Sequence, residues 1–141
     1  MGTSVLLCVS LLGASLASLP ACSTARDPSL AGSEYPVAKA QGQTLDIQVV
    51  RGETDLTLTN TTARSFGRSR LWVNRWYSRE IEKLDVGQSL ELDLSSFRDI
   101  YGEAFRAGGF FATRKPDRVE LVQLETADTM LGLVAVGREA E

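Results

Sequence analysis

The sequence predicts an all-β domain that folds as a two-sheet sandwich. Two observations indicate strands. Apolar residues alternate with polar ones in several short runs after residue 43, and turn-forming residues separate these runs at intervals of about 8–12 residues. The third observation is length, because the 141 residues leave about 120 after an apolar N-terminal stretch, enough for one hydrophobic core but not for two. We therefore expect a single domain.

The N-terminal stretch has the features of an export signal. Residues 4–18 are uncharged and mainly apolar. A run of about 15 residues is too short for a membrane-spanning helix, which needs about 20, but it suits the core of a signal peptide. The run ends in Leu19-Pro20-Ala21-Cys22, in which a leucine lies three positions before the cysteine and a small residue directly before it.

These four residues resemble the lipobox of bacterial lipoproteins. The resemblance implies that residues 1–21 are a signal peptide, that Cys22 becomes the first residue of the mature chain, and that diacylglycerol is attached to its sulfur. Two or three acyl chains anchor a protein stably to a membrane. Ser23, which follows the cysteine, favours the outer membrane by analogy with the enterobacterial sorting rule. The resemblance thus implies a lipid-anchored protein of the cell envelope that faces the periplasm.

Two other interpretations of this stretch remain open. The first is an ordinary secretory signal that is cut near Ala17 or Ala21 and leaves a soluble protein with an unused thiol. The second is a buried N-terminal helix. In the lipoprotein interpretation, residues 22–42 are a lipidated N-terminus followed by a flexible tether, because small and polar residues dominate there and Pro28 and Pro36 interrupt any helix. The sandwich domain is then expected over residues 43–138.

A pair of strands opens the predicted domain. Apolar residues occupy alternate positions on both sides of a turn at 51–53; they are Leu45, Ile47, Val49, Leu56 and Leu58. This spacing predicts a hairpin whose two strands each bury one face.

The middle of the domain is expected to contain three more strands. A third strand is predicted over 70–77, and a short one over 79–84. After a turn at 85–88, alternation predicts an amphipathic strand through Leu90, Leu92 and Leu94.

The last third of the chain begins with a break in the alternation. Ser96 and Asp99 resemble a helix-capping pair, and apolar residues recur at helical spacing up to Phe105, so we expect one short helical turn. A short strand is expected over 110–113, and a final pair over 119–126 and 130–136.

Seven or eight short strands separated by turns are typical of an immunoglobulin-like sandwich. A small barrel is the alternative, because the same alternation of buried and exposed residues also fits a closed sheet.

Composition excludes several kinds of chemistry. The chain has no histidine, which excludes imidazole bases and histidine metal ligands. Its two cysteines are Cys8, in the apolar stretch, and Cys22, so the mature domain is expected to have neither a disulfide nor a free thiol. The net charge of −3 argues against nucleic-acid binding. The acids near Asp93 do not have the spacing of a calcium loop, and we predict no cofactor and no metal site.

The most distinctive stretch of the domain combines arginines with aromatic residues. Residues 64–79 contain no acid, and they include five arginines interleaved with aromatic side chains. Arginine and tryptophan both stack on planar groups, and arginine binds anions through paired donors. The stretch therefore predicts a surface for an envelope protein or for an anionic glycan or lipid. The candidate residues are Arg70, Trp72, Arg75, Trp76 and Arg79.

A structural interpretation of the same stretch is simpler. The tryptophans would fill the core, and the arginines would pair with acids on neighbouring strands. Such exposed pairs contribute about 0.2–1 kcal/mol each and imply no partner. Alternation places Leu71 and Val73 opposite Trp72 and Trp76. Since a sandwich strand buries one face in the core, one of these two sets should lie partly exposed or beneath a loop.

The function expected from these features is a lipid-anchored, non-enzymatic interaction or accessory module of the cell envelope. The alternative is a carboxylate-dependent enzyme that acts on envelope glycan. The enzyme would require a deep pocket with two acids about 5–10 Å apart, and the spacing of the acidic residues in the sequence singles out no such pair.

Overall fold

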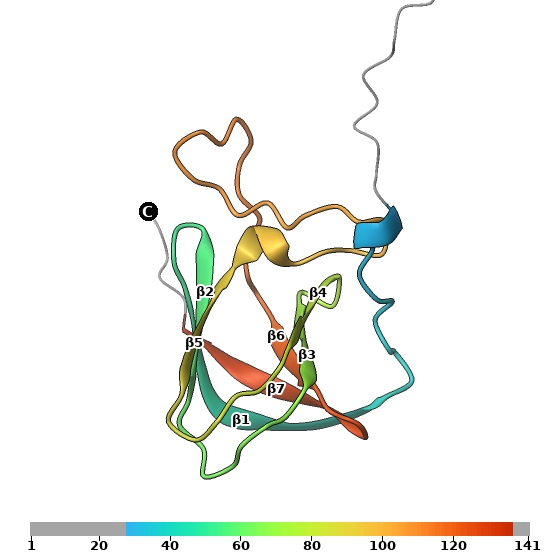
Figure 1. The fold of residues 1–141 in the computed structure, drawn as a ribbon, viewed down its shortest axis with the longest axis vertical. Helices are drawn as coiled ribbons and strands as arrows, with labels where there is room; N and C mark the ends of the chain where they lie inside the picture. The colour runs from blue at the N-terminus through green and yellow to red at the C-terminus, as the bar shows by residue number, and fades with distance from the viewer. Residues whose placement is uncertain (1–27, 137–141) are drawn as a thin grey trace, which may run out of the picture.

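The computed structural model describes residues 28–136, and the fold of this part is all-β, as predicted (Figure 1). Its only helical elements are two 3-10 turns, η1 (Pro28–Leu30) and η2 (Leu94–Ser96). The strands are β1 (Ala40–Arg51), β2 (Asp55–Asn60), β3 (Ser69–Val73), β4 (Tyr77–Ile81), β5 (Ser89–Asp93), β6 (Val122–Glu125) and β7 (Thr129–Val136). Among the described residues, no helix is long and apolar enough to cross a bilayer.

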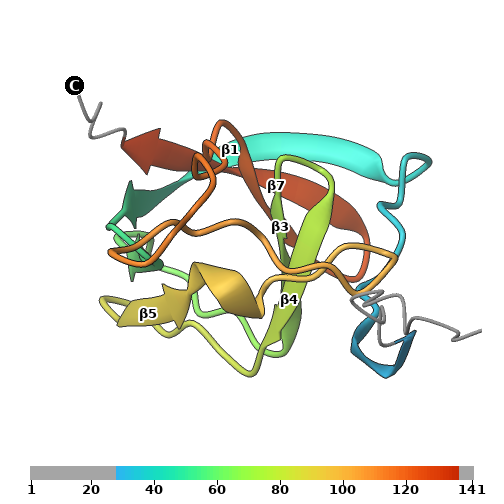
Figure 2. The same ribbon diagram turned by 90° about the horizontal axis from the view of Figure 1, so that it is seen from above.

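All seven strands belong to one hydrogen-bonded sheet, with the order β4-β3-β6-β7-β1-β2-β5. β1 joins the two halves of this sheet, because it pairs with β2 in antiparallel fashion and with β7 in parallel fashion. The sheet curls so that β5 faces the β1–β7 side across the core (Figure 2). The expectation of two separate sheets thus differs from the observed arrangement.

Two further pairs of backbone hydrogen bonds extend the sheet, and the first of them joins its free edge at β4 to the segment that follows η2. Ser78 of β4 donates to the carbonyl of Arg98 at 2.8 Å, and Arg98 donates back at 3.1 Å. Phe66 and Leu84 exchange a second pair, at 3.0 and 2.7 Å, which continues the register of the β3–β4 hairpin beyond the ends of the two strands. These bonds satisfy backbone groups that would otherwise remain unpaired at the edges of the sheet.

The hydrophobic core lies inside the curl and is built by the alternation seen in the sequence. The predicted apolar positions of the first hairpin are all buried there, together with large side chains from β3, β6 and β7. The largest of these core side chains are Phe97, Phe105, Ile47, Leu56, Leu58, Leu71, Leu84, Leu94 and Leu124. Each fully buried side chain of this size contributes about 1.5–3 kcal/mol to folding.

The predicted strand over 70–77 is wrong in one respect, because it is interrupted by a turn. β3 ends at Val73 and β4 begins at Tyr77. Between them, Asn74 and Arg75 have φ angles of 53° and 57°, and Trp76 donates a backbone hydrogen bond to Val73 at 3.1 Å. A strand cannot continue through two left-handed residues, so the chain reverses here and the stretch becomes a hairpin.

The connection from β5 to β6 is less regular than expected. The predicted helical turn over 95–105 is replaced by η2, which Asp93 caps by accepting from the amide of Ser95 at 2.7 Å. The strand predicted over 110–113 does not form; these residues lie at the tip of an exposed loop. The final pair of strands, β6 and β7, is antiparallel as predicted.

The segment before β1 packs against the domain. The predicted tether covered 22–42, but β1 begins at Ala40, and residues 31–39, here called the covering segment, lie along β3 and β4. Gly32 donates to the carbonyl of Asp99 at 2.7 Å, so the segment is held at its N-terminal end as well. The predicted signal peptide, Cys22 and the final residues of the predicted 43–138 domain lie outside the described residues.

Candidate functional site

The five predicted site residues all lie on the β3–β4 hairpin, but they do not form one surface. Trp72 is 1% exposed, whereas Trp76 is 49% exposed. Arg70 and Arg79 lie on the two paired strands, and Arg75 lies in the turn between them. The hairpin therefore divides the predicted site into a covered part and an open part.

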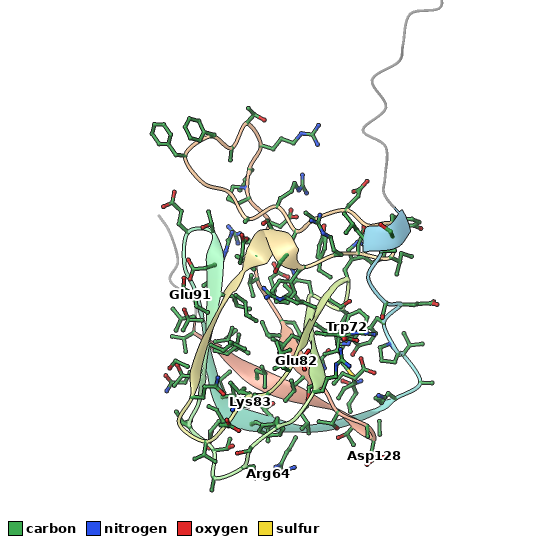
Figure 3. All side chains as sticks on the ribbon, viewed as in Figure 1. Arg64, Trp72, Glu82, Lys83, Glu91 and Asp128 are labelled. Atoms are coloured by element: carbon green, nitrogen blue, oxygen red, sulfur yellow. The ribbon has the colours of Figure 1, made fainter. Side chains whose placement is uncertain are left out.

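Trp72 lies outside the main core, between β3 and the covering segment (Figure 3). Its ring meets that of Tyr35 edge-on, with centroids 5.1 Å apart, and its indole nitrogen donates to Oε2 of Glu125 at 2.7 Å. The prediction that one set of hairpin side chains lies beneath a loop is confirmed for this residue. Trp72 is thus part of the packing of the domain.

A network of polar side chains fixes the covering segment over Trp72. Lys39 donates to Oε1 of Glu125 at 2.7 Å and to the carbonyl of Thr126 at 2.9 Å. Tyr35 donates to Gln123 at 2.8 Å. Burial raises the pKa of the Glu125 carboxyl, but the hydrogen bonds from Lys39 and Trp72 outweigh burial and hold that pKa below its ordinary value. The carboxylate is therefore kept ionised as the centre of the network.

Arg70 and Arg79 have partners within the domain. Arg70 pairs with Glu80 across the hairpin at 2.5 Å and also donates to Ser33 of the covering segment. Arg79 donates to the hydroxyl of Ser96 in η2 at 2.6 Å. Both guanidinium groups have partners in the domain, but only Arg70 pairs with an acid on a neighbouring strand, as the structural interpretation expects; the partner of Arg79 is a hydroxyl.

The turn of the hairpin holds the open part of the site. Asn74 tolerates a left-handed backbone and is tied down by its side chain, which donates to the carbonyl of Arg118 at 2.7 Å and accepts from the amide of Glu120 at 2.9 Å. Arg75 has no such tolerance, and a left-handed residue of this kind costs about 1–2 kcal/mol. Its guanidinium carbon lies 5.7 Å from the centre of the Tyr35 ring.

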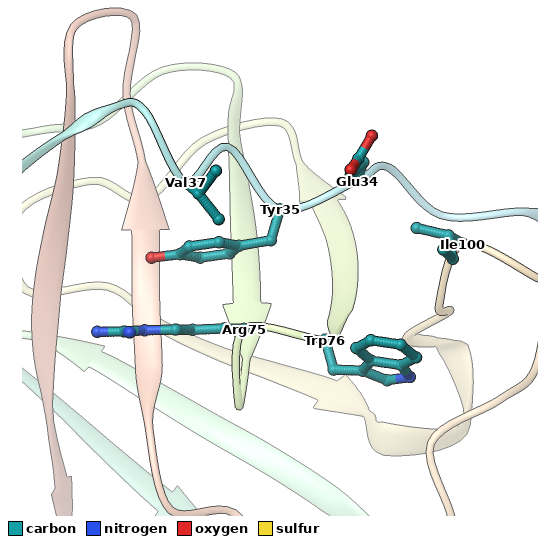
Figure 4. Close-up of a pocket in the computed structure, with 6 residues that line it drawn as sticks. All are labelled: Glu34, Tyr35, Val37, Arg75, Trp76 and Ile100. Atoms are coloured by element: carbon teal, nitrogen blue, oxygen red, sulfur yellow. The ribbon is translucent and has the colours of Figure 1, made fainter.

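A groove of about 320 Å³ runs between this turn and the covering segment (Figure 4). Tyr35 and Arg75 lie one above the other on one side of the groove, and Trp76 lies on the other (Figure 4). The indole nitrogen of Trp76 donates to Asp99 at 3.3 Å, which orients the ring. The residues that line the groove are Glu34, Tyr35, Val37, Arg75, Trp76 and Ile100.

A second depression lies beside the covering segment, over the strand ends that carry Arg70 and Glu125. It contains two carboxylates, but each is bound to cations: Glu80 to Arg68 and Arg70, and Glu125 to Lys39. No group of three or more metal-binding side chains is found in the part of the chain that the structure describes. This depression is therefore an ion-pair network.

Sequence reasoning identified Arg75 and Trp76 but missed the other residues that line the groove. Tyr35 and Val37 flank Pro36 in the segment predicted to be a tether, and Ile100 lies in the segment predicted to be helical. The signal that was available is composition, since a tyrosine and a valine beside a proline are unusual in a solvated linker.

Comparison with family models, with curated proteins and with solved structures finds no match for this chain.

Proposed function

We propose that this protein is a lipid-anchored, non-enzymatic interaction module of the cell envelope, and that it binds a partner protein through the groove beside the β3–β4 turn. Anchoring is attributed to acylation of Cys22, on the strength of the Leu19-Pro20-Ala21-Cys22 motif. Outer-membrane placement, facing the periplasm, rests on Ser23 as before.

The binding proposal rests on the backbone conformation and the side-chain contacts of Arg75. Its backbone is left-handed and its side chain is exposed. Within the described residues, its guanidinium contacts the Tyr35 ring but forms no ion pair. The hairpin turn requires the left-handed backbone at this position, but arginine is a costly residue there, and a residue that keeps such strain is typical of a functional position. Arginine, tryptophan and tyrosine are also the residues most enriched at the energetic centre of protein interfaces.

The charge of the groove favours a protein over a polyanion as the partner. Glu34 lines the same groove as Arg75 and is exposed. A carboxylate in the same groove would repel the phosphates of an anionic glycan or lipid, whereas a protein surface can offer a basic group to Glu34 and an acidic group to Arg75. Apolar contact with Val37 and Ile100 would supply the remaining complementarity.

We also propose an immunoglobulin-like sandwich in which β1 joins the two sheets. The order β1-β2-β5 corresponds to the A-B-E strands of that fold, and β3-β6-β7 to its C-F-G strands. β4 lies beside β3 in the place of the additional C′ strand. In this arrangement, the hairpin turn and the covering segment lie on the outer side of the C-F-G sheet, where a partner can reach them.

The acids of the second depression support a non-enzymatic role over hydrolysis of glycan. A general acid in a glycosidase needs a raised pKa. The pKa of Glu125 is instead lowered by its hydrogen bonds to Lys39 and Trp72, which outweigh burial. A carboxyl that remains ionised and bound to two donors is not suited to protonating a leaving group.

Anchoring is tested by the mass of the N-terminal peptide of the native protein. We expect a peptide that begins at Cys22 and carries the mass of a diacylglyceryl group and a further acyl chain. A Cys22 thiol that reacts with an alkylating reagent would refute the anchoring proposal.

Binding is tested by site-specific photo-crosslinking in intact cells. A photoreactive residue replaces Val37, which lines the groove and is 85% exposed, and a matched probe replaces Val86, an exposed valine in the β4–β5 turn. We expect a discrete adduct from position 37 alone, and its loss in the Arg75→Glu background. The control substitution is Arg68→Glu, at an arginine whose side chain is 70% exposed at the other end of the hairpin. An identical adduct from both positions, or one that survives Arg75→Glu, would refute the proposal.

A further inference from the structure

The loop between Arg106 and Asp117, here called the Phe loop, exposes two large apolar side chains at its tip. Phe110 is 92% exposed and Phe111 is 91% exposed. Their rings contact each other edge-on, with centroids 5.0 Å apart. Folding gains nothing from two adjacent phenylalanines in water, and a cluster of exposed large apolar residues marks a contact surface.

The base of the Phe loop is closed by specific bonds. Arg106 forms a two-bond ion pair with Asp117, at 3.1 and 2.7 Å, and the backbone amide of Asp117 donates to the carbonyl of Arg106 at 2.9 Å. Arg51 of β1 donates to the carbonyl of Ala107 at 2.8 Å. The loop is therefore tied to the sheet at its base and projects a defined tip.

The tip itself is a turn that displays both rings. Ala112 donates a backbone hydrogen bond to Gly109 at 3.0 Å, which places Phe110 and Phe111 at the two central positions of the turn. Gly109 has a φ of 104°, which favours glycine. A side chain there would also meet the methyl group of Thr54 at 3.1 Å. The turn thus displays both rings in solvent, away from the core.

Two basic residues follow the rings after a gap of two small residues. Arg114 and Lys115 are both exposed, and neither forms an ion pair within the described part of the chain. This combination is typical of a protein surface that lies on an anionic bilayer. The aromatic rings enter the boundary between headgroups and acyl chains, and the cations lie nearby at the level of the phosphates.

The position of the Phe loop in the fold agrees with this pattern. Figure 1 shows the Phe loop and η1 at the same end of the molecule, and Figure 2, which looks down on that end, shows them on opposite sides of it. η1 begins at Pro28, which is six residue steps after Cys22, and each step spans at most about 3.6 Å. If Cys22 carries lipid, this end lies within about 20 Å of the bilayer.

We infer that the Phe loop is a second membrane contact, in which Phe110 and Phe111 insert into the interface of an anionic phospholipid bilayer while Arg114 and Lys115 bind lipid phosphates. The inference rests on the proposed lipid anchor, which raises the local concentration of the tip at the membrane and lets a weak contact become well populated. The two contacts together orient the domain, so that the end opposite the Phe loop points away from the bilayer.

Fluorescence quenching by brominated lipids tests the inference on the full lipidated protein. The protein is reconstituted on vesicles of phosphatidylethanolamine and phosphatidylglycerol that contain lipids brominated high in the acyl chains. For Phe110→Trp, we expect a blue-shifted, strongly quenched signal above the wild-type background from Trp72 and Trp76. The matched control is Val86→Trp, at an exposed valine in the β4–β5 turn, for which we expect no added quenching.

Charge reversal gives a second, independent readout. Each basic residue near an anionic surface contributes about fivefold in affinity, equivalent to about 1 kcal/mol. The double change Arg114→Glu and Lys115→Glu, in the Phe110→Trp background, should therefore lower the ratio of inserted to free tips by about 25-fold or more. Replacing phosphatidylglycerol by a zwitterionic lipid should have a similar effect on the parent variant.

The outcomes separate this inference from the proposed function. If the N-terminal peptide carries lipid and the protein stays on the vesicles, but the indole at position 110 remains unquenched, the inference fails and the anchor stands. If the peptide carries no lipid, the anchoring proposal fails on its own readout. An indole that stays in water on vesicles but is shielded in intact envelopes would assign the Phe loop to a protein partner and overturn the inference.

Discussion

The two tryptophans of the β3–β4 hairpin are four residues apart, and they occupy opposite kinds of environment. Trp72 is covered, donates to an ionised glutamate and packs against Tyr35. Trp76 is half exposed and lines an open groove beside a strained arginine. Tyr35 belongs to both regions, because its ring covers Trp72 and also contacts Arg75. The comparison shows that one run of arginines and aromatic residues can contain both side chains that pack within the domain and side chains that stay open to a partner.

The sharpest way to break this comparison is to remove each tryptophan in turn. Trp72→Ala is expected to lower the free energy of unfolding by about 3–5 kcal/mol, because a large buried side chain leaves a cavity under the covering segment. Trp76→Ala is expected to change it by less than about 1 kcal/mol, since half of that side chain is already in water. Denaturation with urea, followed by circular dichroism, measures both. Equal losses from the two variants would contradict the division of the hairpin.

Releasing the covering segment should produce an intermediate effect. Lys39→Met removes the amine that donates hydrogen bonds to Glu125 and to Thr126, but it keeps the apolar stem of the side chain. We expect a loss of about 1–2 kcal/mol, typical for hydrogen bonds to a charged group. Protection of the Gln123 and Leu124 amides from hydrogen exchange should be little changed, while the indole of Trp72 becomes accessible to a soluble quencher. A Trp72 that stays shielded would show that Lys39 does not hold the segment.

Relief of the backbone strain at the turn is expected to act on the free energy of unfolding in the opposite direction. Arg75→Gly removes the unfavourable left-handed conformation but loses the contact with Tyr35. We expect the free energy of unfolding to stay unchanged or to rise by up to about 1 kcal/mol, while crosslinking of the partner from position 37 disappears. The same urea titration and crosslinking experiments measure the two quantities. A loss of more than about 1 kcal/mol would instead make Arg75 a structural residue.

The smallest expected effect is a dependence of stability on pH. The pKa of Glu125 is raised by burial but lowered more strongly by its hydrogen bonds to Lys39 and Trp72, so it lies below its unfolded value. At pH values near these two pKa values, the unfolded chain binds more protons than the folded one, so stability falls as the pH decreases. The contribution is complete above the ordinary pKa of glutamate, about 4.3, and is lost as the pH falls through the lowered pKa. Between pH 6 and pH 3, Glu125→Gln should lose less stability than the wild type, because it has no carboxylate to protonate at this position. Identical pH profiles for the two proteins would refute this role.

Local patterns predicted most of the strands because alternation reports which face of a strand is buried. Leu45, Ile47 and Val49 are all buried on one face of β1, and the final antiparallel pair is where it was expected. The hairpin turn at Asn74–Arg75 was missed because neither residue type demands a left-handed backbone. Its conformation depends on bonds from the Asn74 side chain to residues more than 40 positions away.

The open site was predicted only in part. Arg75 and Trp76 were identified from their types, but the same reasoning included Arg70 and Arg79, whose partners Glu80 and Ser96 lie within the domain. Side-chain pairing across a hairpin depends on register, and register depends on where the turn lies. An error in the position of the turn therefore carries over into the membership of the site.

The sequence by itself determined that the domain is all-β, which side chains of β1 and β2 enter the core, and that histidine and thiol chemistry are absent from residues 28–136. It did so because burial on one face of a strand imposes a period of two on neighbouring residues. Only the tertiary structure decided that β1 joins the sheet to β7 in parallel, that residues 31–39 cover Trp72, and that the Phe loop stands clear of the core. Each of these depends on contacts between segments far apart in the chain, for which a local pattern carries no signal.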